Sequence, residues 1–163
     1  MGNFRKITLV LTLIICSSVC SFAQNADSKQ YKCMVQMTNY AGEEAYIVVS
    51  LINPKGVYEK TIYMFAKDKK WYKDLEEWHK FNKKKPANIS AITGASVAGG
   101  DRSIKVFEIE DSKINKGYKL RFEVAVEDKE YHVKDLEVPL TTANVSGKID
   151  GIGYIRYVRI SPN

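Results

Sequence analysis

One segment of the sequence combines residue types that suit chemistry on a hydroxyl group. Residues 90–96 are Ser-Ala-Ile-Thr-Gly-Ala-Ser, and the last four place a hydroxyl on either side of two small residues. Gly94 permits backbone angles that other residues avoid, and Ala95 adds little bulk. An enzyme that modifies a hydroxyl must close over the surrounding chain. The arrangement therefore favours Ser96 as the hydroxyl that such an enzyme would modify.

The segment resembles the acceptor motif of bacterial flavin transferases, which consists of Asp, two residues, Ser or Thr, Gly, Ala, and Ser or Thr. In that family the final hydroxyl is joined to flavin mononucleotide (FMN). The resemblance implies that Ser96 carries the cofactor and that Thr93, Gly94 and Ala95 complete the cofactor-binding segment. Ser90 stands where the motif has Asp. The chain therefore lacks the motif's own acid, which would position a metal ion or the attacking hydroxyl.

The residues after the segment extend the resemblance. Two glycines, 99–100, precede an expected strand at 103–107, and Gly-Tyr at 117–118 precedes a strand that ends in Val-Glu at 126–127. This succession resembles a family of exported bacterial proteins, domain of unknown function 2271, over about residues 31–160. The resemblance implies an immunoglobulin-like sandwich, a flavin or redox role, and a membrane electron-transfer partner of the PepSY type.

Most of the chain has the pattern of short β-strands. Polar and apolar residues alternate, as in strands with one buried face, and the turn at 53–56, Asn-Pro-Lys-Gly, predicts a hairpin. The expected strands are 31–38, 45–52, 57–65, 103–109, 118–126, 131–138 and 151–160. Together with one helix, this pattern predicts an all-β, antiparallel, immunoglobulin-like β-sandwich of about seven strands.

The one predicted helix covers residues 69–81, where Trp71, Leu75 and Trp78 recur at helical spacing. Pro86 disfavours helix at the residue before it, so the helix is expected to end there. Trp71, Tyr72 and Trp78 are candidates to stack on an isoalloxazine ring. The favoured interpretation is that Trp71 and Trp78 anchor the helix to a sheet. The lysines at 80 and 83–85 either attract a phosphate or form a solvated surface, which is the favoured interpretation.

The N-terminus predicts export. Two basic residues precede an apolar run at 7–16, and Ser21-Phe22-Ala23 suits a signal peptidase. We expect a signal peptide at 1–23, a flexible leader at 24–30 and one domain at 31–163. The apolar run is too short for a permanent membrane helix, which needs about 20 residues. The mature protein is therefore expected not to be transmembrane, and to lie in the periplasm or at the cell surface.

Lipid attachment at Cys20 is the weaker alternative, because Val19 precedes it where a small residue is usual. Cys33 is the one cysteine of the mature chain and cannot form an internal disulfide. Its apolar neighbours predict a buried packing residue rather than a reactive thiol. Export and a net charge of only +6 in the whole chain argue against a nucleic-acid partner.

Catalysis by side chains alone has little support in the sequence. His79 and His132 are the only histidines and do not have a metal-ligand spacing. No nucleophile-elbow pattern defines a catalytic triad. We therefore expect an exported electron-transfer accessory protein that is not an enzyme by itself. It would carry FMN attached by a flavin transferase. The alternative is a cofactor-free β-sandwich that binds a protein or a ligand.

Overall fold

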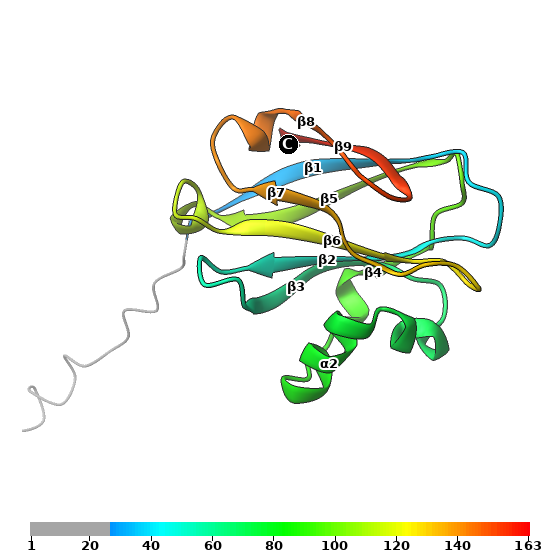
Figure 1. Cartoon of the computed structure of the whole chain (residues 1–163). Coiled ribbons are helices and arrows are strands. Elements are labelled where there is room, and N and C mark those ends of the chain that lie inside the picture. Colours follow the sequence, from blue (N-terminus) through cyan, green and yellow to red (C-terminus); the bar gives the residue numbers. More distant parts are fainter. Residues whose placement is uncertain (1–26) are drawn as a thin grey trace, which may run out of the picture.

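A computed structural model describes residues 27–163, and two β-sheets stacked face to face form most of it (Figure 1). The strand orders are β5-β1-β9-β8 and β4-β3-β2-β6-β7. This confirms the predicted sandwich with one short helix. Neighbouring strands are antiparallel except β3 and β4, which run parallel. The predicted signal peptide (1–23) and Cys20 lie outside the described residues.

The strands are β1 (Ser28–Met37), β2 (Tyr46–Ile52), β3 (Tyr58–Phe65), β4 (Thr93–Gly94), β5 (Arg102–Glu110), β6 (Lys119–Ala125), β7 (His132–Pro139), β8 (Lys148–Asp150) and β9 (Ile155–Pro162). The helix is α2 (Glu76–Lys84), and the 3-10 turns are η1 (Lys69–Asp74), η2 (Ser90–Ile92), η3 (Asp111–Lys113) and η4 (Asn144–Ser146). Seven strands match predicted segments. β4 and β8 are too short to produce a periodic pattern. The first three residues of β1 overlap the predicted leader.

The main core lies between the two sheets. Along β1 every second side chain points inward, and Tyr31, Cys33, Val35 and Met37 are buried there. Burial raises the pKa of the Cys33 thiol to about 12. Because the thiolate is the reactive form of cysteine, this side chain is inert. The structure thus confirms Cys33 as a buried packing residue.

A second apolar cluster covers the outer face of the five-stranded sheet, on the side where Figure 1 shows α2. We call it the outer cluster; it consists of Val48, Met64, Ala66, Tyr72, Leu75, Trp78, Ile89 and Ala125. The predicted helix at 69–81 is divided, because Leu75 leaves helical angles between η1 and α2 (φ −85°, ψ 67°). Trp78 is fully buried and its indole N–H donates to Thr61 Oγ1 at 2.9 Å. α2 ends at Lys84, two residues before Pro86.

A buried carboxylate joins α2 to the sheet beneath it. Glu123, on β6, accepts hydrogen bonds from the hydroxyls of Tyr58 and Tyr131, both at 2.5 Å, and from the backbone N–H of Trp78 at 3.1 Å. Burial raises the pKa of Glu123, although these three donors act against the rise. The network fixes the first turn of α2 over the sheet.

The predicted hairpin of β2 and β3 is confirmed. The side chain of Asn53 accepts from the backbone N–H groups of Lys55 at 3.0 Å and Val57 at 3.1 Å. Gly56 has φ +79°, a left-handed conformation that glycine adopts without strain. The hairpin carries β3 to the position where β4, the central part of the hydroxyl-bearing segment, pairs with it.

Candidate functional site

The segment at 90–96 is more ordered than a plain loop. η2 leads into β4, where Thr93 and Gly94 pair with Met64 and Phe65 of β3. The Thr93 hydroxyl donates to the backbone carbonyl of Ile89 at 2.7 Å, which closes the turn behind β4. The segment therefore forms one edge of the five-stranded sheet.

Ser96 lies between two points where the backbone is held. On one side the N–H of Ala66 donates to the carbonyl of Gly94 at 2.8 Å. On the other side Ala45 and Val97 exchange two backbone hydrogen bonds, at 2.8 and 3.1 Å. The half-buried Ser96 is therefore presented from a fixed backbone position.

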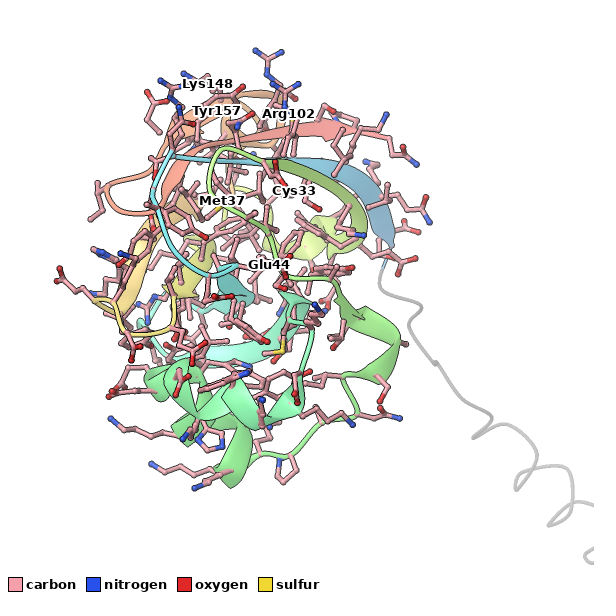
Figure 2. The ribbon with its side chains drawn as sticks, turned by 90° about the vertical axis from the view of Figure 1, so that its right-hand side faces the viewer. Cys33, Met37, Glu44, Arg102, Lys148 and Tyr157 are labelled. Atoms are coloured by element: carbon pink, nitrogen blue, oxygen red, sulfur yellow. The ribbon has the colours of Figure 1, made fainter. Side chains whose placement is uncertain are left out.

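The hydroxyl of Ser96 donates a hydrogen bond to the carboxylate of Glu44. Glu44 lies in the connection between β1 and β2, 52 residues before Ser96. Figure 2 places it between the four-stranded sheet and the green helical segments. A carboxylate in this position can take up the proton of the hydroxyl. Glu44 is not predicted from the sequence, because no local spacing connects it to Ser96.

Ser96 opens into a cavity of about 480 Å³ at the end of the sandwich. Its lining combines two aromatic rings, two amines and five carboxylates: Tyr46, Trp71, Lys67, Lys70, Glu43, Glu44, Asp68, Asp74 and Glu127, with Ala125 and Val126 at the base. The Lys70 ammonium lies 4.9 Å from the Trp71 ring centroid. The side chain of Asp68 caps η1 by accepting from the N–H of Lys70 at 3.0 Å. The volume is within the range of small-molecule sites.

The other residues of the segment face a different cavity. Ser90, Thr93, Gly94 and Ala95 line a volume of about 410 Å³, and Lys67 borders both cavities. The structure therefore separates Ser96 from the residues predicted to share its site. Gly94 has a steric role, since a Cβ there would lie 2.3 Å from the hydroxyl of Tyr63.

The three aromatic candidates from the sequence have different positions. Tyr72 and Trp78 are buried against each other, with ring centroids 5.6 Å apart. Trp71 alone of the three borders the Ser96 cavity. The packing interpretation thus holds for Trp78 but is wrong for Trp71, which lies outside the outer cluster.

One comparison with known proteins identifies the family. The family model for domain of unknown function 2271, described as a predicted periplasmic protein, matches residues 28–157. The chain belongs to this family. No match was found among curated proteins or solved structures. The family's description as periplasmic agrees with the export that the N-terminus of this chain predicts.

Neither a membrane-spanning helix nor a metal-binding cluster is found in the described part of the chain. Across residues 27–163, no helix is long and apolar enough to cross a membrane. In the same range, no three His, Cys, Asp or Glu side chains are grouped so that they could hold a metal ion.

Proposed function

We propose that this periplasmic chain carries FMN esterified to Ser96 and passes electrons to a membrane redox partner. One observation carries the proposal. The Ser96 hydroxyl is paired with the Glu44 carboxylate at the wall of a cavity that also contains the Trp71 ring. Nucleophile, proton acceptor and aromatic surface therefore lie together on a segment that resembles a flavin acceptor.

Attachment requires Ser96 to lose a proton and gain a phosphorus bond. The oxygen of Ser96 bonds to the flavin-side phosphorus of a flavin dinucleotide, and the pyrophosphate bond breaks. The nucleoside monophosphate leaves with the bridging oxygen. The Glu44 carboxylate accepts the proton of the hydroxyl, the role of a general base within hydrogen-bond reach. Glu44 thus supplies the carboxylate that the motif lacks at Ser90.

The side chains around Ser96 suit the parts of the cofactor. Trp71 and Tyr46 offer faces for a planar ring, and Lys67 and Lys70 offer positive charge to a phosphate. The flavin supplies the electron-transfer chemistry when bound, and the protein supplies position and charge. A covalent tether keeps the cofactor at a high effective concentration beside its partner.

The charge of the cavity favours a second candidate function. Five carboxylates and two amines line it. A surplus of negative charge suits a cationic ligand or a basic peptide segment, by electrostatic complementarity. The second candidate is therefore a cofactor-free sandwich that binds such a ligand in the same cavity.

The deciding experiment is to express the full chain in a bacterium with an active flavin transferase and to weigh the purified protein intact. We expect a mass higher by one FMN less one water. Ser96→Ala should abolish the increase and Ser96→Thr should retain it, because the motif accepts either hydroxyl. Glu44→Gln should slow attachment about 100-fold if the carboxylate acts as the base.

Ser112→Ala is the matched control, since Ser112 is an exposed serine in η3, outside the segment. It should leave the mass increase intact. An unmodified mass for the wild-type chain, with the transferase active on another acceptor, would contradict the proposal. Binding of a cationic peptide that Glu44→Gln weakens would then favour the second candidate.

A further inference from the structure

Strand β5 forms an open edge of the four-stranded sheet. Its ladder with β1 shows which backbone groups point outward. The N–H of Met37 donates to the carbonyl of Asp101 at 3.0 Å, and the N–H of Asp111 donates to the carbonyl of Asp27 at 2.9 Å. The odd-numbered residues of β5 therefore bond to β1. In an antiparallel ladder the even-numbered residues turn both N–H and C=O the other way.

Four of these even-numbered residues are ordered so that two antiparallel copies of the strand would match each other in charge and apolar character. Arg102, Ile104, Val106 and Glu108, which we call the edge tetrad, point their side chains to the outer face of the sheet, where all four are exposed. Ile104 is 52% exposed and Val106 44% exposed, among the few large apolar side chains on the described surface. The tetrad is basic at one end, acidic at the other and apolar between. Figure 2 shows Arg102 at the outer side of this sheet.

We propose that the edge tetrad pairs with the same strand of a second copy of this chain, antiparallel about a twofold axis at Lys105. In this register Arg102 of each copy faces Glu108 of the other, and Ile104 faces Val106. Because the tetrad residues also carry the outward backbone groups, each facing pair can exchange two backbone hydrogen bonds. The result is one continuous sheet with four strands from each copy.

The neighbouring registers do not give this match. A shift of two residues in one direction places Ile104 opposite Glu108, and a shift in the other direction places Arg102 opposite Val106. Each of these sets a charge against an apolar side chain. Only the register centred on Lys105 joins opposite charges and apolar pairs together, which are the favourable cross-strand combinations.

Part of β5 borders a hollow between the two sheets. A cavity of about 350 Å³ opens along the edge, between residues 106–108 of β5 and residues 60–63 of β3. One feature opposes the pairing. The two Lys105 side chains meet at the axis, although each ammonium lies toward its own Tyr63 ring, 5.8 Å from the centroid. Edge lysines weaken strand pairing, so the dimer is expected to be reversible.

Charge-swapped variants of the full exported chain test the pairing. Analytical ultracentrifugation over a concentration series should show a monomer–dimer equilibrium for the wild type. Arg102→Glu and Glu108→Arg should each weaken the dimer about tenfold, because two attractive pairs become repulsive. A mixture of the two variants should form a heterodimer, because one chain is then acidic and the other basic at both positions and each facing pair again joins opposite charges. Lys105→Thr should form a tighter dimer than the wild type does.

Arg156→Glu is the control, since Arg156 is exposed on β9 of the same sheet and lies outside the tetrad. It should leave the dissociation constant unchanged. A chain that stays monomeric at millimolar concentration overturns the proposal and leaves the edge to a strand of another protein. A dimer that ignores the charge swaps, or a mixture that fails to form the heterodimer, also overturns it. The Ser96→Ala variant should dimerise normally, so the result is independent of flavin attachment.

Discussion

The outer faces of the two sheets differ in burial: one is covered by other parts of the chain and the other is exposed. η1 and α2 cover the outer face of the five-stranded sheet, where Val48, Met64 and Ala125 are buried in the outer cluster. The outer face of the four-stranded sheet has no such cover within residues 27–163. Ile104 and Val106 remain exposed there. One sheet is thus buried on both sides and the other on one side only.

This difference is visible in the sequence of the strands. Residues 46–52, Tyr-Ile-Val-Val-Ser-Leu-Ile, are nearly continuous in apolar character, and six of these seven residues are buried in β2. β5 instead alternates, with Phe107 and Ile109 buried on either side of the exposed Glu108. A strand that loses its period of two has both faces covered. A strand that keeps the period has a face free for water or for a partner.

Removing a large side chain from the covered outer face of the five-stranded sheet should have the largest effect on stability. Trp78→Ala removes the largest fully buried side chain and its hydrogen bond to Thr61. We expect the free energy of unfolding to fall by about 4 kcal/mol, the usual cost of emptying a large aromatic site. Urea titration followed by circular dichroism measures it. Trp71→Ala, at a half-buried ring outside the outer cluster, should cost about 1 kcal/mol or less. Equal losses for both tryptophans would mean that α2 does not anchor through Trp78.

The buried carboxylate of the covered face should give stability an unusual pH dependence. Because burial raises the pKa of Glu123, the unfolded chain releases this proton at a lower pH than the folded chain does. The folded state then holds more protons above the ordinary carboxyl range, about pH 4 to 4.5. The contribution of Glu123 to the free energy of unfolding therefore falls as the pH rises through its folded pKa, by up to about 1.4 kcal/mol per pH unit.

Glu123→Gln removes this titration, so urea titrations at a series of pH values should show a smaller decline for the variant. Glu137 is a control in which the pKa shift has the opposite direction. Burial alone would raise its pKa, but hydrogen bonds from Lys119 and Arg121 hold it below the ordinary value. Its contribution is present above the ordinary carboxyl range and is lost as the pH falls. Glu137→Gln should therefore flatten the acid side only. The same decline in wild type and Glu123→Gln would show that Glu123 does not carry it.

The fold was largely predictable because its signals are local. Alternation along β1 and the Asn-Pro-Lys-Gly turn each depend on residues close together in the chain. The predicted helix began too early because the spacing of Trp71 and Leu75 also fits a 3-10 turn followed by a break. β4 was missed for a related reason. Two residues paired in parallel with β3 carry no period of their own.

The candidate site was only partly predictable because its parts come from distant segments. Ser96 follows from a resemblance in seven consecutive residues. Glu44 reaches it only because the bridge between Ala45 and Val97 brings the two connections together. Trp71 borders the cavity, a position that the helical pattern did not reveal. Contacts that depend on tertiary packing have no trace in local spacing.

A substitution on the exposed outer face of the four-stranded sheet should have the smallest effect on stability. Ile104→Thr replaces an exposed apolar side chain with another β-branched one, which suits a strand equally well. We expect the free energy of unfolding, measured at micromolar protein, to change by less than about 0.5 kcal/mol. The proposed dimer should nevertheless weaken, because the apolar pair with Val106 is lost in both halves. Ile47→Thr is the matched change at a fully buried position, and it should cost about 2 kcal/mol. If Ile104→Thr costs as much as Ile47→Thr, a part of the chain covers this face and the contrast between the sheets is wrong.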